Sequence, residues 1–168
     1  GVQTCALPIL PELHQAILQC YSEHYVEHSK TDAWFEGVAD MLDELSDLGL
    51  KLAVATGKSR KGLDRVLAQT QSQDLFVATR AASETKSKPD PLMLQEILNS
   101  TDVPVGQAIM VGDTSFDLEM AQNIAMPRVG VSYGVHSVDV LQRFNPLSIA
   151  HDVNALHQFL NAQVNKTE

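Results

Sequence analysis

Two aspartates four residues apart, Asp113 and Asp117, directly follow a short apolar segment, residues 108–112. Two carboxylates at the end of a buried strand form a hard-oxygen site suited to Mg²⁺. Gly112 lets the backbone turn sharply where the strand ends. The structural alternative is that Asp113 caps the next helix and Asp117 lies exposed on its first turn, where the helix dipole favours a negative charge. We favour the metal site.

A second candidate site lies at Thr56 and Gly57, which follow the apolar segment 51–56. A hydroxyl and unpaired backbone N–H groups at the start of a helix form an anion-binding site. The next helix also begins with cations, which its dipole disfavours: Lys58, Arg60 and Lys61. Cations at an unfavourable position next to a strand end indicate a functional site, although a solvated basic turn explains the same residues equally well.

The third candidate is Lys88, within the segment Ser87-Lys-Pro-Asp-Pro91. A lysine held in a rigid turn before a proline-fixed helix start is suited to direct its ammonium group at a phosphate.

A nucleotide-binding P-loop is a different explanation for Gly57-Lys58-Ser59. It is excluded because Leu52 occupies the position where that motif requires a glycine.

Apolar periodicity predicts the helices and strands that must position these residues. Helices are expected over 10–28, 38–48 (ended by Gly49), 59–69, 91–98 (with Asp90 as N-cap and Pro91 first), 115–125, 138–144 and 153–162. Strands are expected over 51–56, 75–79, 108–112, 128–132 and 148–150. This alternation predicts an α/β fold, a parallel sheet with helices on both faces, whose ligands bind beyond the carboxyl ends of the strands.

Composition excludes several classes of protein. A net charge of −9 argues against a general affinity for nucleic acid or for an anionic membrane. No apolar segment approaches the ~18 residues that a membrane helix needs, and no signal peptide is recognisable. Cys5 and Cys20 are too few for a disulfide framework, so we expect a cytoplasmic protein. Oligomeric state is not readable from the sequence.

The order of the three sites resembles the motifs of the haloacid dehalogenase-like hydrolases. Thr56 matches the second motif of that superfamily, Lys88 the third, and Asp113 with Asp117 the fourth. The segments SKPDPLM and MVGDTSFDLEMA are similar to the phosphoglycolate-phosphatase-like branch. The resemblance extends from about Ala33 to the end of the chain. It implies a Rossmann-like core and a phosphatase that hydrolyses a small phosphate monoester through an aspartyl-phosphate.

The resemblance also implies a role for each residue. Thr56 and the backbone N–H of Gly57 would bind the phosphoryl group, and Lys88 would neutralise phosphate and nucleophile together. Asp113 would bind the cofactor Mg²⁺ directly, while Asp117 would act on the metal through water or by orienting Lys88. The partner would be a small phosphorylated metabolite.

One motif of the superfamily has no counterpart. The nucleophile and general acid belong to an Asp-x-Asp-x-Thr segment, and no Asp-x-Asp occurs in this sequence. Residues 1–9 resemble a translated sequencing adapter, residues 10–32 the remnant of a helical cap, and residues 33–168 the hydrolase core. We expect an N-terminal truncation that leaves out the central first strand, between the strands ending at Thr56 and Asp113. The chain should then be inactive and poorly stable.

Several alternatives stay open. The chain could be a non-catalytic pseudoenzyme that binds a phosphorylated ligand or partner, or it could derive from a phosphosugar mutase of the same superfamily. A dehalogenase is disfavoured because that reaction needs no metal. His24-Tyr-Val-Glu-His28 fits a zinc-peptidase pattern, but no third ligand supports zinc.

Overall fold

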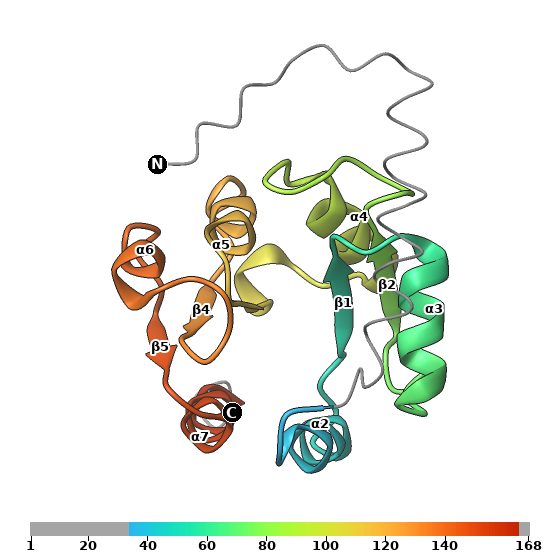
Figure 1. Cartoon of the computed structure of the whole chain (residues 1–168), viewed down its shortest axis with the longest axis horizontal. Helices are drawn as coiled ribbons and strands as arrows, with labels where there is room; N and C mark the ends of the chain where they lie inside the picture. The colour runs from blue at the N-terminus through green and yellow to red at the C-terminus, as the bar shows by residue number, and fades with distance from the viewer. Residues whose placement is uncertain (1–33, 165–168) are drawn as a thin grey trace. The chain divides into compact units, whose positions relative to one another are not determined.

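A computed structural model describes residues 34–164, in which helices and strands alternate (Figure 1). The helices are α2 (Val38–Asp47), α3 (Arg60–Gln69), α4 (Leu92–Thr101), α5 (Ser115–Gln122), α6 (Val138–Gln142) and α7 (Val153–Val164), with a 3₁₀ turn at Val105–Gln107. The strands are β1 (Ala53–Thr56), β2 (Ala78–Ala81), β3 (Met110–Gly112), β4 (Arg128–Val131) and β5 (Ser148–Ala150).

The strands form two parallel sheets rather than one. Strand β1 pairs with β2, and β3, β4 and β5 form a second sheet with β4 in the middle. Among the described strands, β1 and β3 each have one partner, so each leaves an edge unpaired. The prediction of a parallel α/β fold is confirmed. Among the described strands, the one that ends at Thr56 and the one that ends at Gly112 belong to different sheets.

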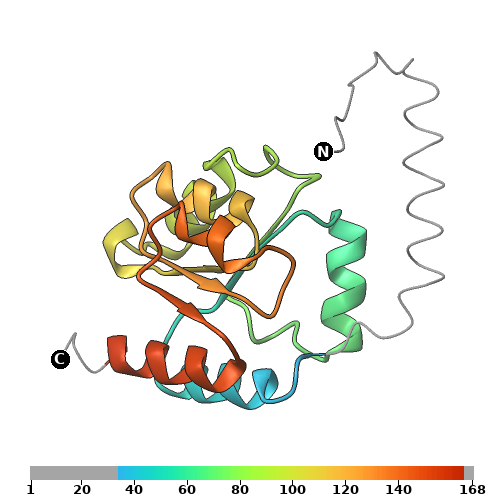
Figure 2. The same cartoon turned by 60° about the vertical axis from the view of Figure 1, so that its left-hand side comes forward.

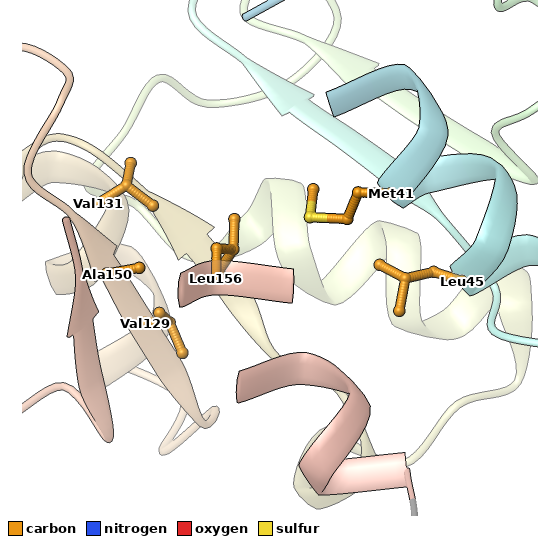
Figure 3. Close-up of a cluster of buried hydrophobic side chains, with 6 residues drawn as sticks. All are labelled: Met41, Leu45, Val129, Val131, Ala150 and Leu156. Carbon is orange, nitrogen blue, oxygen red and sulfur yellow. The ribbon is translucent and has the colours of Figure 1, made fainter. Parts of the chain in front are cut away.

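Helices cover both faces of the strands, as side-chain alternation requires. Val129 and Val131 of β4 point into a cluster that also contains Met41 and Leu45 of α2 and Leu156 of α7 (Figure 3). Helices α2 and α7 lie side by side in both views (Figures 1 and 2). A second cluster, around α4 and α5, contains these residues: Met93, Leu94, Met120, Ala121 and Met126.

Strand β3 shows the two faces most directly. Ile109, just before the strand, packs against the α2–α7 cluster, whereas Met110 packs against the α4–α5 cluster. Strand β1 alternates in the same way, with Val54 directed to α3 and Ala55 to α4. The end of each of these short strands is therefore contacted by helices on both faces.

Two predicted boundaries are wrong. The strand expected over 75–79 begins three residues later and spans Ala78–Ala81. Phe76 is apolar because it packs on α3, and Val77 is 60% exposed and donates its N–H to Leu52, so this apolar stretch leads into the strand. Helix α4 begins at Leu92 with Pro91 as N-cap, although the Asp90 carboxylate still accepts from the Leu92 N–H at 3.0 Å.

The other boundaries agree within three residues, and the largest differences are at the ends of α4 and α5. Gly49 follows the end of α2 with φ of +82°, the left-handed conformation expected of a terminating glycine. The predicted helix over 10–28, the cap remnant, and the His24–His28 pattern lie outside the described residues. Within residues 34–164, no helix is both long and apolar enough to span a membrane.

Candidate active site

The five residues selected from the sequence surround one cavity of about 600 Å³. It lies where β1 and β3 end, the edge at which parallel sheets bind ligands. Thr56 and Gly57 line it from the end of β1, Asp113 and Asp117 from β3 and α5, and Lys88 from the turn before α4. The structure thus brings together all of the predicted site residues.

Lys88 is held by two oxygens from different elements. Its Nζ donates to the carbonyl of Ala55 at 2.9 Å and to Asp117 Oδ1 at 2.5 Å. The two charged side chains are largely buried, with 16% and 7% of their areas exposed. An ammonium group has three N–H donors, so these two acceptors leave one donor for a ligand in the cavity. The peptide bond between Lys88 and Pro89 is cis.

Both carboxylate oxygens of Asp117 are hydrogen-bonded to other residues of the chain. Oδ2 accepts from the Thr114 N–H at 3.1 Å and from the Thr114 hydroxyl at 2.7 Å. Thr114 also accepts from the Asp117 N–H, so the pair forms a capping box at the start of α5. The alternative of an Asp113 cap with an exposed Asp117 is wrong, because Thr114 is the N-cap and Asp117 is buried.

Gly112 serves a different purpose from the one predicted. It is not among the glycines with positive φ, so no sharp left-handed turn requires it. A Cβ atom at this position would lie less than 3.0 Å from both Cβ and Cγ of Asp117. The glycine is therefore needed for space, since the Asp117 side chain lies directly against the end of β3.

Asp113 presents its carboxylate to the cavity from the residue after β3. Its Oδ2 accepts from the backbone N–H of Val135 at 3.0 Å. Among the described residues, no donor is bonded to Oδ1. One carboxylate oxygen is thus fixed by the protein, and the other is available for a ligand.

At the end of β1, the Thr56 hydroxyl oxygen accepts from the Lys58 N–H at 3.1 Å. This bond orients the hydroxyl while leaving its own proton to donate elsewhere. Gly57 lines the same cavity. A hydroxyl donor and a turn of backbone therefore lie beside the Lys88 ammonium group, as an anion site requires.

Arg60 has a structural role that its position in the sequence does not indicate. Its guanidinium binds Glu84 through two bonds, at 2.9 and 2.6 Å, and also Asp64 at 3.2 Å. Hydrogen bonds from Arg60 and from the Ala81 N–H lower the pKa of Glu84 to about 2. The same pairing raises the pKa of Arg60. Arg60 fastens α3 to the segment after β2 and does not line the cavity.

Some residues at the site were missed. Thr114 could have been found, because a threonine three residues before an acidic side chain is a capping signal. Nothing in the sequence indicated the carbonyl of Ala55 as a partner of Lys88, nor Val135 and His136 as neighbours of Asp113. These contacts depend on which strand lies next to which.

The oxygen atoms at this cavity fit Mg²⁺ in part. This ion prefers oxygen ligands and is usually held by one or two carboxylates together with phosphate and water. Asp113 offers a carboxylate oxygen of that kind, whereas both oxygens of Asp117 are already bonded. No group of three or more candidate metal-ligating side chains exists within residues 34–164. The residues fit a partial site completed by other oxygens.

Two curated proteins are similar to this chain in sequence. Pyrophosphatase PpaX of Halalkalibacterium halodurans is 29% identical over 81% of the chain. The phosphoglycolate phosphatase of Psychrobacter arcticus is also 29% identical, over 87% of the chain. The chain spans 64% and 63% of the lengths of these two relatives.

The fold also matches solved structures. The crystal structure of a hydrolase from Pseudomonas syringae superposes with a TM-score of 0.81, covering 92% of this chain and 74% of that one, at 19% identity. At that identity the match supports the fold alone. The family model described as haloacid dehalogenase-like hydrolase matches residues 6–131. The predicted resemblance is therefore confirmed, and the chain belongs to the haloacid dehalogenase-like hydrolase family.

Proposed function

We propose that these residues form the phosphate-binding and magnesium-binding part of a phosphatase site that acts on a small phosphorylated metabolite. The observation that carries the proposal is the convergence of Thr56, Lys88, Asp113 and Asp117 on one cavity at the ends of β1 and β3. The reaction would be attack of an aspartate carboxylate on the phosphorus of a phosphate monoester, which releases the alcohol and forms an aspartyl-phosphate. Water would then hydrolyse this intermediate to inorganic phosphate and the free aspartate.

Each residue has a defined part in this reaction. Thr56 would donate its hydroxyl proton to a phosphoryl oxygen, beside the backbone N–H of Gly57. Lys88 would place its remaining N–H donor between phosphate and nucleophile, held there by Asp117 and by the carbonyl of Ala55. Asp113 would hold Mg²⁺ through Oδ1. When bound, the ion would offset the repulsion between the two anionic reactants.

The nucleophile is the part that this sequence does not supply. It contains no Asp-x-Asp, and both carboxylates at the cavity have other tasks. We propose that the chain on its own has little or no phosphatase activity, and that a version with an Asp-x-Asp-x-Thr segment is active. Two relatives named as phosphatases match most of this chain, and their names suggest phosphoglycolate or pyrophosphate as the first substrates to try.

The direct test is binding of inorganic phosphate to the chain in the presence of Mg²⁺, measured by isothermal titration calorimetry. We expect binding that is lost in Lys88→Met and weakened in Thr56→Val. A change at Lys51, which donates to the carbonyl of Thr101 away from the cavity, is the matched control and should leave phosphate affinity unchanged. Equal binding by wild type and Lys88→Met would overturn the assignment.

Two alternatives would give other results. A pseudoenzyme would bind phosphate but stay inactive after the Asp-x-Asp-x-Thr segment is provided. A phosphosugar mutase would convert a hexose phosphate to its isomer with little release of inorganic phosphate. The retention of Lys88, Asp113 and Asp117 together supports the phosphatase over the pseudoenzyme, because binding alone does not need all three. A cytoplasmic location is part of the same proposal.

A further inference from the structure

The segment that follows β4, residues 133–136, contacts Asp113 at three places. Val135 donates its N–H to Asp113 Oδ2 at 3.0 Å, and His136 donates its N–H to the Asp113 carbonyl at 3.1 Å. The third contact is Gly134, which lies against the Asp113 side chain. Both the backbone and the carboxylate of Asp113 are thus bound by one short segment.

The His136 side chain fastens this segment to the next helix. Its Nδ1 accepts from the backbone N–H of Ser115, the first residue of α5, at 2.9 Å. This N–H is one of the four at a helix start that have no partner within the helix. The Phe116 ring lies beside the imidazole, with centroids 6.2 Å apart. The imidazole therefore ties the segment after β4 to the start of the helix that carries Asp117.

Gly134 leaves the space that this arrangement needs. A Cβ atom there would lie less than 3.0 Å from Cβ, Cγ and Oδ2 of Asp113. Gly134 is not among the residues with positive φ, so its value lies in close approach rather than in conformational freedom. Any larger residue at this position must displace the Asp113 carboxylate or the segment itself.

These contacts bear on metal binding because they decide which way the carboxylate faces. The Val135 N–H binds Oδ2 of Asp113. Asp113 is therefore left with Oδ1 as the single oxygen that can bind a cation. Mg²⁺ demands near-ideal octahedral geometry, so a small rotation of a ligand weakens its binding. Groups that orient a ligand from behind typically contribute 10-fold to 100-fold in metal affinity.

We propose that residues 133–136 form a positioning loop for Asp113, with Gly134 and His136 as positioning residues that set its affinity for a divalent cation. The proposal rests on the proposed function, in which Asp113 is the metal ligand. It adds that the affinity depends on a segment distant in sequence from every motif of the site.

The test is Mn²⁺ binding to the folded chain, measured by the loss of the free-ion signal in electron paramagnetic resonance. Gly134→Ala and His136→Gln should lower affinity by roughly 10-fold to 100-fold. His136→Asn should keep an affinity close to that of wild type, because the amide oxygen of asparagine can lie where Nδ1 lies. The longer glutamine places its oxygen elsewhere. Gly106→Ala is the control for Gly134→Ala, because nothing lies within 4 Å of an added Cβ there.

The outcomes separate the two proposals. If wild type binds Mn²⁺ no better than Asp113→Asn, the metal role of Asp113 fails. If Asp113→Asn loses binding but His136→Gln and Gly134→Ala bind like wild type, the positioning loop alone is wrong. Thermal unfolding of each variant identifies any that does not fold. If Gly134→Ala proves unstable, the comparison of His136→Asn with His136→Gln still decides whether the loop sets the metal affinity of Asp113.

Discussion

At the scale of single residues, the site depends on charges that are mutually bonded inside the protein. Lys88 and Asp117 neutralise each other while largely buried, and each has a further backbone or hydroxyl partner. A buried charge without a partner is costly, because desolvation is then not offset. The same pair is therefore expected to matter for folding as well as for binding.

Lys88→Met should destabilise the chain by about 3 kcal/mol, the lower end of the range for breaking a buried ion pair, since Lys88 keeps slight exposure. The second change, Asp117→Asn, should recover part of that loss when combined with it, because the amide carries no charge and can still accept from Thr114. Urea unfolding of the single and double variants measures the coupling. Additive effects of the two changes would contradict a direct interaction.

Gly112→Ala should also destabilise the chain, by about 1–3 kcal/mol, because the added methyl group must displace the Asp117 side chain. Its matched control is Gly106→Ala, at a position open to solvent, which should be nearly neutral. Urea unfolding compares the two. Similar free energies of unfolding for both variants would mean that Asp117 can shift at little cost.

At the scale of elements, ion pairs and caps fix the helices that carry the site. Arg60 joins α3 to Glu84 in the segment after β2, and the Thr114–Asp117 capping box fixes the start of α5. The sequence pattern alone suggests a functional or a solvated role for the cations at the start of α3. In the structure Arg60 serves neither purpose and instead connects two neighbouring elements.

The Arg60–Glu84 pair predicts a specific acid sensitivity. The pKa of Glu84 is lowered from 4.5 to about 2 in the folded chain, so the pair contributes stability that is fully present above pH 4.5. That contribution is lost as the pH falls from 4.5 towards 2. The difference in unfolding free energy between wild type and Glu84→Gln should therefore shrink over this range. A difference independent of pH would show that the charge of Glu84 is not responsible.

Local patterns predicted most elements, because apolar periodicity and capping depend on neighbouring residues. The α/β class, β5, and the starts of α5, α6 and α7 follow from such patterns. Strand β2 was misplaced because Phe76 and Val77 are apolar for reasons outside the strand ladder. The contacts of Ala55, Val135 and His136 with the site could not be predicted, since they join strands and loops that are distant in sequence.

At the scale of the whole described region, the main feature is the division into two sheets. Strand β4 has partners on both sides, whereas β1 and β3 have one each among the described strands. An unpaired edge presents free backbone donors and acceptors, and it favours pairing with another strand. The cavity lined by Thr56, Lys88 and Asp113 lies at the ends of these two edge strands, so stability and ligand binding are expected to depend on the same place.

Amide hydrogen exchange should reflect this division. We expect β4 to exchange most slowly, because both of its edges are paired and Val129 is fully buried. Strands β1 and β3 should exchange faster. Exchange followed by mass spectrometry compares the three strands. Protection of β1 equal to that of β4 would mean that its second edge is covered in solution.

The most direct test of the account is release of inorganic phosphate from p-nitrophenyl phosphate, with and without Mg²⁺. It compares this chain with a version that carries an Asp-x-Asp-x-Thr segment, and with the Lys88→Met variant of that version. We predict that only the version with the segment and with Lys88 is active, and only with Mg²⁺. Equal activity of the chain without the segment would contradict the account, because another residue would then supply the nucleophile.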